Sequence, residues 1–433
     1  HTTITMMLIS CSLLAQNIDT KIADKHFNSY DYVDAAKAYQ KLIDEGKTDS
    51  YIYKKLGDSY YHMFKVSEAI IWYKKSLQSE QDAQTYFRYA QMLKANGDYD
   101  EANAQMKTFA RLAPDDLRAK EFQNHPDYLS TLNQIKDAYT LKSLSINSAN
   151  ADFGAILSGS TLYFTSARNI NGKVYGWNNE PYLDIYQLTL NEDSTFSEPE
   201  SVPELNSKFH DGPATLSSDG NTIYFSGDSF REDLFDKDKK NKLKIGKNNL
   251  YRASKINGQW GEIVPLPFNS SGYSVSNPSL SQDGKVLYFS SNMTGSYGGV
   301  DIWKVSIDGK SYGKPENLGP KVNTEGNESF PFIAKDNSTL FFASNGRQGY
   351  GGYDVFKIEL ETTTEAVNLG QPINSAQDDF AFTYNDDQKM GFLSSNRNGN
   401  DDIYQIFPIC SVDLIVKVIN EETSELISDS KVS

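Results

Sequence analysis

One phrase recurs along this chain, and such a repeat restricts the possible folds more than any other feature. Residues 288–305 read YFSSNMTGSYGGVDIWKV, and residues 341–358 read FFASNGRQGYGGYDVFKI. Both copies contain an apolar run, a glycine-containing loop and an Asp-aliphatic-aromatic triplet. Self-similarity of this kind is typical of repeat architectures, in which each copy is one supersecondary unit.

The triplet recurs five times, once with Asn in place of Asp, as Asp184-Ile185-Tyr186, Asn249-Leu250-Tyr251, Asp301-Ile302-Trp303, Asp354-Val355-Phe356 and Asp402-Ile403-Tyr404. A short apolar run precedes each triplet, at 161–166, 222–227, 286–291, 339–344 and 390–395. Short unbroken apolar runs predict strands that are buried on both faces. Turn pairs such as Asp283-Gly284 precede these runs and favour tight hairpins.

A second mark, an apolar residue followed by Asn and then Ser or Thr, separates the copies. Its Asn residues are Asn147, Asn206, Asn269, Asn323 and Asn374, with spacings of 59, 63, 54 and 51 residues. Each unit therefore has room for about four short strands, and radial repetition of four-stranded blades is a β-propeller. We predict a propeller over residues 138–408 with five blades. Six blades is the alternative, if a divergent blade lies in a long insertion.

The order of the marks also predicts how the ring closes. The first Asn mark precedes the first hairpin, and no similar mark follows Tyr404. We therefore expect the strand around residues 139–146 to supply the outer strand of the last blade, whose other strands come from residues 378–407.

Residues 16–125 have helical spacing rather than strand spacing. Small residues recur at Ala35, Ala69 and Ala102, which are 34 and 33 residues apart. A period of about 34 residues with a small residue where two helices touch is the tetratricopeptide pattern. Stacked helix pairs leave a groove. This groove has two possible roles, as a spacer or as a binding site for a peptide or partner helix. Residues 126–137 are expected to be a linker.

The two ends have different compositions. Residues 1–15 are apolar and predict a secretory signal peptide cleaved after Ala15, with lipidation of Cys11 as the alternative. Residues 409–433 alternate apolar and polar residues and resemble the start of a carboxypeptidase-regulatory-like β-sandwich, which about 25 residues cannot complete. No stretch approaches about 18 consecutive apolar residues, so no transmembrane helix is expected.

Composition and motifs argue against several classes of function. The formal charge of −15 argues against a nucleic-acid groove, which needs a basic face. Five scattered histidines predict no metal site. Cys11 and Cys410 do not indicate a disulfide framework. No G-x-S-x-G or H-E-x-x-H motif occurs, and the charged run at 236–241 lacks the Gly and Glu of a calcium loop. We therefore expect no cofactor and no catalytic site.

The loops that join the second and third strands of each blade are unequal. Three are short and rich in Gly or Asn (292–300, 345–353 and 396–401), and two are long insertions (167–183 and 229–247). In propellers these loops share a face with the Asn marks. Exposed aromatic and basic side chains there predict a partner-binding surface, with candidates Tyr175, Trp177, Tyr182, Arg231, Lys239, Lys240, Arg347, Tyr350 and Arg397. The alternative is that the insertions are merely solvated.

Two stretches, 214–228 (ATLSSDGNTIYFSGD) and 278–292 (PSLSQDGKVLYFSSN), resemble the PD40, or TolB-like, class of WD40-like repeat. The domain order as a whole resembles the multidomain OmpA-family proteins of Bacteroidota, the family of the PorE-type component of the type IX secretion and gliding machinery. This resemblance implies a non-enzymatic periplasmic scaffold at the outer membrane. Its partners would be proteins of a secretion or gliding complex, and also peptidoglycan, which a C-terminal OmpA-like domain absent from this sequence would bind.

A second hypothesis is a carbohydrate- or peptide-binding propeller, or a hydrolase, with its site in the central channel. Propellers host such sites, so the fold alone does not decide between the two hypotheses. Acidic and aromatic side chains that converge at the channel mouth would favour a ligand site. A channel lined by Ser, Gly and backbone atoms would favour the scaffold.

Overall fold

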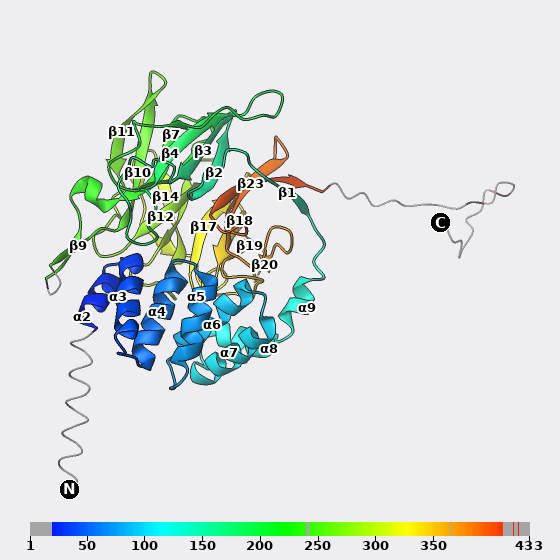
Figure 1. Cartoon of the computed structure of the whole chain (residues 1–433). Helices are drawn as coiled ribbons and strands as arrows, with labels where there is room; N and C mark the ends of the chain where they lie inside the picture. The colour runs from blue at the N-terminus through cyan, green and yellow to red at the C-terminus, as the bar shows by residue number, and fades with distance from the viewer. Residues whose placement is uncertain (1–19, 240–241, 364, 410–418, 420–422, 424–433) are drawn as a thin grey trace, which may run out of the picture.

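The computed structural model describes residues 20–239, 242–363 and 365–409, together with residues 419 and 423. Eight helices are followed by five antiparallel sheets arranged as the blades of a propeller (Figure 1). The predicted order of helices before strands is confirmed, as is the number of five blades. The predicted signal peptide with Cys11, and nearly all of the predicted β-sandwich segment, lie outside the described residues.

The helical region occupies residues 20–132, and its helices are α2 (Lys21–Asn28), α3 (Tyr32–Asp44), α4 (Ser50–His62), α5 (Val66–Ser76), α6 (Ala83–Ala95), α7 (Tyr99–Leu112), α8 (Leu117–Asn124) and α9 (Tyr128–Leu132). The recurring Ala35, Ala69 and Ala102 are completely buried. A larger side chain at these positions would separate neighbouring helices, so the period of small residues sets the packing of the helical region.

The segment 126–137, which we expected to be a linker, contains α9. Tyr128 and Leu132 of this helix are buried in the same apolar cluster as Phe122 of α8 and Phe109 of α7. The start of this segment is therefore packed against the helical region, and only residues 133–138 connect α9 to the first strand.

Each blade is one antiparallel sheet, and we number the blades by chain order. Blade 1 contains β2 (Asp152–Ser158), β3 (Thr161–Ser166), β4 (Asp184–Thr189) and β5 (Glu200–Ser201); blade 2 contains β6 (Asp211–Leu216), β7 (Thr222–Asp228), β10 (Asn248–Ile256) and β11 (Gln259–Pro265); blade 3 contains β12 (Val275–Leu280), β13 (Val286–Ser291), β14 (Asp301–Asp308), β15 (Ser311–Tyr312) and β16 (Glu316–Asn317); blade 4 contains β17 (Glu328–Ile333), β18 (Thr339–Ser344), β19 (Asp354–Glu359) and β20 (Val367–Asn368).

Blade 5 closes the ring as the sequence predicted. It contains β21 (Asp379–Asn385), β22 (Met390–Ser395) and β23 (Asp402–Pro408), and its outer strand is β1 (Tyr139–Ser143) from the other end of the propeller. The strands β1 and β23 pair antiparallel, with Tyr139 opposite Pro408 and Ser143 opposite Tyr404. The predicted apolar runs are the second strands, and every residue of β18 and β22 is buried.

The Asn marks fasten each blade to the next. The side chain of each Asn accepts a hydrogen bond from the backbone N–H of the aliphatic residue in the triplet of the preceding blade around the ring. In blade 4, for example, Val355 N–H donates to Asn374 Oδ1 at 2.7 Å, and Asn374 Nδ2 donates back to Val355 O at 2.9 Å. The same pair forms at the ring closure between Asn147 and Ile403, at 3.0 Å in both directions. A buried backbone pair left without these partners would cost stability, which explains why the mark recurs.

The glycines of the recurring phrase allow two loops to touch. A Cβ atom on Gly351 would lie 2.0 Å from the carbonyl oxygen of Gln377, and a Cβ on Gly298 would lie 2.4 Å from that of Gly326. In both cases the glycine of one blade passes over the turn that follows the next Asn mark. Only a residue without a side chain fits such a close backbone approach.

Replacing Gly351 by Ala is therefore expected to lower the free energy of unfolding by about 1–3 kcal/mol, because the backbone must move to relieve the overlap. Gly272 offers a matched control, since a Cβ there would meet no atom closer than 3.5 Å. Gly272→Ala should stay within about 1 kcal/mol of the parent protein. Urea denaturation of both variants measures the difference, and equal stabilities would contradict the steric explanation.

One face of the helical region packs against the propeller face that carries the loops between second and third strands (Figure 1). We call this the loop face. Hydrogen bonds from several loops cross the contact: Gln91 Nε2 to Asn345 O (2.9 Å), Lys94 Nζ to Gly349 O (3.3 Å), Tyr99 Oη to Tyr350 O (3.0 Å), Gln377 Nε2 to Ala95 O (2.7 Å) and Trp177 Nε1 to His62 O (2.7 Å). The helical region thus engages the chain's own propeller, a role that neither of the two predicted uses of its groove included.

Candidate functional site

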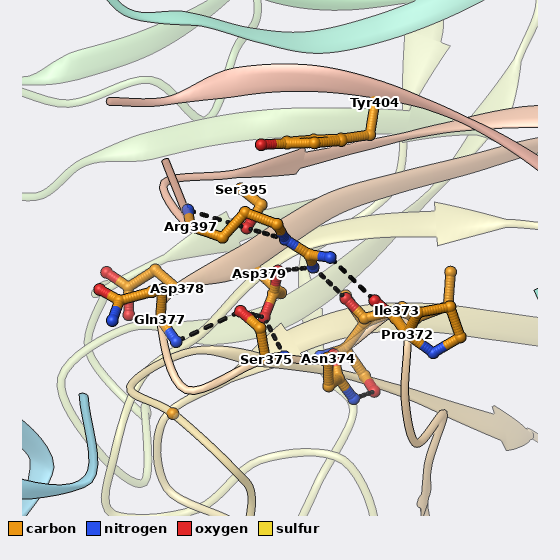
Figure 2. Close-up of polar contacts among 12 residues, drawn as sticks. Pro372, Ile373, Asn374, Ser375, Gln377, Asp378, Asp379, Ser395, Arg397 and Tyr404 are labelled. Carbon is orange, nitrogen blue, oxygen red and sulfur yellow. Dashed lines mark hydrogen bonds and ion pairs between the residues drawn. The ribbon is translucent and has the colours of Figure 1, made fainter. Parts of the chain in front are cut away.

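Three arginines that we predicted to bind a partner make intramolecular contacts. Arg397 forms an ion pair with buried Asp379 and donates to Ile373 O at 2.7 Å (Figure 2). Arg231 does the same in blade 2, with Asp211 and the carbonyl of Leu205 as its partners. In each case the arginine ties the start of the innermost strand to the Asn mark before it.

Arg347 of blade 4 makes the backbone part of this contact. It donates to the carbonyls of Lys321 (2.9 Å) and Val322 (3.2 Å). The carboxylate at the start of the innermost strand is here Glu328, which accepts hydrogen bonds from Thr324 and from Ser344 Oγ. The three predicted arginines therefore stabilise the ring.

Blade 3 lacks this ion pair because both of its members are replaced. Val275 stands where blade 5 has Asp379, since Val275 pairs with Ser291 as Asp379 pairs with Ser395. Met293 stands two residues after Ser291, the position that Arg397 occupies after Ser395. Both replacements are buried in one apolar cluster. The two positions thus hold an ion pair in blade 5 and two apolar side chains in blade 3.

The aromatic candidates of the first insertion lie between the two parts of the chain. Trp177 packs edge-on against Tyr32 of α3 at 4.8 Å between ring centroids. Tyr175 and Tyr182 both contact the ring of His210, at 4.5 and 4.4 Å. These side chains cover the loop face and contact the chain's own helices and blade 2.

Tyr350 is the most deeply placed candidate. It is 2% exposed and belongs to the apolar cluster of the helical region, together with Phe122 and Tyr128. Its counterpart in the other copy of the phrase, Tyr297, is 50% exposed. The same motif therefore anchors the helical region in blade 4 and remains at the surface in blade 3.

The basic insertion of blade 2 is the predicted surface that stays exposed. It forms a short hairpin of β8 (Asp236–Asp238) and β9 (Leu243–Ile245). Lys239 is exposed, and Lys240 lies outside the described residues. Lys237 and Lys244 flank the Phe235 ring, at 5.5 and 4.0 Å from its centroid. This hairpin presents exposed positive charge on an acidic protein.

The central channel has two different halves. On the side of the hairpin turns, hydroxyl groups join neighbouring innermost strands: Leu280 N–H donates to Thr215 Oγ1 (3.2 Å), and Ile333 N–H donates to Ser279 Oγ (3.0 Å). The middle of the channel retains a space of only about 30 Å³ beside Pro213, Phe330 and Pro331. Phe332 and Phe382 also line this space, so it is more apolar than the lining of Ser, Gly and backbone atoms that we expected for a scaffold.

The other end of the channel, beneath the loop face, is acidic and aromatic. A cavity of about 340 Å³, which we call the mouth cavity, is lined by Phe153, Trp177, Glu180, His210, Phe330 and Asp401 among others. Sequence reasoning missed Glu180, His210 and Asp401. Glu180 lies in an insertion that we had singled out, whereas nothing in the sequence brings it together with Asp401. This lining is the one we expected for a ligand site.

A second space, the interface cavity, lies between the helical region and the propeller and measures about 520 Å³. Tyr61, Arg88 and Gln91 line it from the helices, and Tyr353 and Asp378 line it from the propeller. Its polar groups are largely engaged: Arg88 pairs with Asp58 at 2.9 Å, and Asp378 Oδ1 accepts from Tyr353 N–H at 2.8 Å.

Burial controls the protonation of the mouth cavity. Burial raises the pKa of Asp401 to about 7, and the nearby charge of Glu180 adds to this effect. Burial likewise raises the pKa of Glu180 and lowers that of His210 to about 4. Leu183 N–H donates to Nδ1 of His210 at 3.1 Å, so the neutral ring carries its proton on Nε2. That buried Nε2–H has no hydrogen-bond partner among the described residues.

Only one cluster in the described part of the chain has a geometry that suits a metal ion. It comprises His26, Asp31 and Asp34, whose ligand atoms lie within 4.8 Å of one another. These groups already have protein partners, because His26 Nδ1 lies 2.8 Å from Asp31 Oδ2 and Lys37 pairs with Asp34 at 2.7 Å. Among the described residues, no helix is both long and apolar enough to span a bilayer.

Comparison with known proteins finds similarity to solved structures alone. No protein-family model and no curated protein matches the chain. A putative TolB from Agrobacterium tumefaciens is 16% identical with a TM-score of 0.36, over 60% of this chain and 78% of that one. A Dyadobacter fermentans protein of unknown function is 12% identical with a TM-score of 0.37, over 61% and 79%. An α-L-arabinofuranosidase from Lactobacillus brevis is 12% identical with a TM-score of 0.35, over 65% and 93%. Similarities this weak assign no function.

Proposed function

We propose that this protein is a non-enzymatic scaffold of the bacterial periplasm, associated with the outer membrane. It holds a secretion or gliding complex in place and links it to peptidoglycan. In the family that the sequence resembles, a C-terminal OmpA-like domain makes this link. The observation that supports a scaffold is the packing of the helical region against the loop face. Hydrogen bonds and the buried Tyr350 join the two parts into one block.

A block of this kind suits a scaffold because it positions its outer surfaces relative to one another. Binding to a preorganised surface avoids the cost of ordering two separate domains. Since most of the predicted contact residues lie inside the block, the exposed hairpin of β8 and β9 becomes the proposed docking surface. Its lysines would attract an acidic partner surface and speed the encounter.

The test is an affinity pull-down of the full-length chain from its native envelope, followed by mass spectrometry. The variant bait carries Lys237→Glu, Lys239→Glu and Lys244→Glu. The control bait replaces three exposed lysines elsewhere by Glu, at Lys41, Lys107 and Lys310, so that the same number of charges is reversed. Arg231 is left intact because it stabilises the ring.

We expect the unaltered chain to retain outer-membrane proteins of a secretion or gliding complex. Recovery by the hairpin variant should fall at least about tenfold, because like charges across an interface suppress binding. Recovery by the control variant should not change. Recovery of no envelope protein by the unaltered chain would refute the scaffold. Equal loss in both variants would place the contact away from the hairpin.

A further inference from the structure

The mouth cavity has an unusual balance of side chains. Two carboxylates line it, Glu180 and Asp401, together with four aromatic residues, Phe153, Tyr175, Trp177 and Phe330. No Lys or Arg of the described chain is among its lining residues. The remaining polar groups include the amides of Asn248 and Asn277. The cavity therefore offers negative charge and aromatic faces, with no positive charge of its own.

The carboxylates have few partners within the protein. Other buried carboxylates of the ring meet an arginine, as Asp379 meets Arg397, or accept several hydrogen bonds, as Glu328 does from Thr324 and Ser344. In the mouth cavity, no described residue donates a hydrogen bond to the Asp401 side chain. Glu180 accepts hydrogen bonds from Asn178 Nδ2, at 3.0 Å, and from the backbone N–H of Ala151, but it forms no ion pair with a described residue. Both residues are partly buried, and a carboxylate that is partly removed from water without a cation is destabilised, so the arrangement favours a positive ligand or protonation.

We propose that the mouth cavity is a binding site for an organic cation, an ammonium or guanidinium group. The group would lie between Asp401 and Glu180 and contact the faces of Trp177 and Phe330. Aromatic faces attract cations through their quadrupole, and the attraction is larger where the cation is desolvated. Anionic ligands are disfavoured because the lining carries carboxylates and no Lys or Arg. The free Nε2–H of His210 adds one donor for an acceptor atom elsewhere on the ligand.

Size and access fit a small ligand or a single side chain. The volume of about 340 Å³ lies at the lower end of the range for ligand pockets. Asn178 and Asn248 line the cavity and are exposed, so it opens to solvent beside the first insertion. The cation could belong to a free amine or to a Lys or Arg side chain of a peptide. The site is separate from the hairpin of β8 and β9 and does not depend on the scaffold function.

The experiment is isothermal titration calorimetry of the full chain with three probes. Choline is a free cation, Nα-acetyl-lysine methylamide presents a lysine side chain, and 3,3-dimethyl-1-butanol is the neutral isostere of choline. The variants are Asp401→Asn and Glu180→Gln, singly and together. Glu192→Gln is the matched control, because Glu192 is exposed and does not line the cavity. Thermal melting checks that each variant is folded.

We expect at least one of the two cations to bind with a Kd below about 1 mM, corresponding to a free energy of about −4 kcal/mol. The double variant should weaken this binding at least tenfold, and Glu192→Gln should leave it unchanged. Tighter binding of choline would indicate a free organic cation as the ligand, and tighter binding of the capped lysine would indicate a peptide. Equal binding of the neutral isostere, unchanged binding by the folded double variant, or no binding of either cation would overturn the proposal. The comparison of choline with its neutral isostere uses the unaltered chain, so it tests the proposal even if a variant fails to fold.

Discussion

Replacing Arg397 by Met is expected to lower the free energy of unfolding by about 3–5 kcal/mol, the cost of leaving one partner of a buried ion pair alone. The carboxylate of Asp379 is completely buried, and Arg397 is its cationic partner (Figure 2). Arg397 also donates to the carbonyls of Pro372 and Ile373. Urea or thermal denaturation measures the loss.

Blade 3 suggests a double variant that should restore the stability. The double variant Asp379→Val with Arg397→Met reproduces the pair Val275 and Met293, which occupies the same two positions and is buried. Replacing a buried ion pair by apolar side chains of similar volume is often neutral. We therefore expect the double variant to recover most of the lost stability. A double variant as unstable as Arg397→Met would show that blade 3 tolerates the apolar pair for a reason particular to its surroundings.

Replacing Tyr350 by Ala is expected to cost about 3–5 kcal/mol, because it removes a fully buried aromatic side chain from the contact between propeller and helices. The substitution should weaken mainly the contact between the helical region and the propeller. Denaturation followed separately by helical circular dichroism and by near-ultraviolet signals should then give two transitions where the unaltered chain gives one.

Tyr297→Ala is the control for this variant. Tyr297 precedes the same Gly-Gly pair in blade 3, but half of its surface is exposed. Surface substitutions of this kind usually stay within about 0.5 kcal/mol of the parent protein. If both variants lost the same stability, the role of Tyr350 in joining the two parts would be refuted.

The ring was predictable from sequence because its contacts are local and repeated. The five Asn marks and triplets gave the number of blades, and the position of the first mark gave the closure by β1. Four of the five marks bind a triplet about 20 residues before them, as Asn374 binds Val355. Only the closing pair, Asn147 with Ile403, joins distant parts of the chain.

The contact between the helices and the propeller was not predictable, because it depends on distant residues that no repeat marks. Tyr350 and Tyr297 both precede a Gly-Gly pair, but Tyr350 is buried and half of Tyr297 is exposed. Glu180 and Asp401 meet only after the ring has closed and the first insertion has folded over the channel. Arg397 was predicted to bind a partner because its loop lies on the loop face, yet Asp379 and two carbonyls occupy its guanidinium. Arg168, which binds Asp152 in the same way, was missed although it also stands two residues after the last Ser of its strand.

Small-angle X-ray scattering of the full-length chain tests the central claim, that the helical region and the propeller form one block. The docked arrangement predicts a pair-distance distribution with a single main maximum and a scattering profile that the arrangement of the described residues reproduces. A distribution with two separate maxima would show that the helical region stands apart from the loop face. It would then contradict both the proposed block and the intramolecular role of Tyr350.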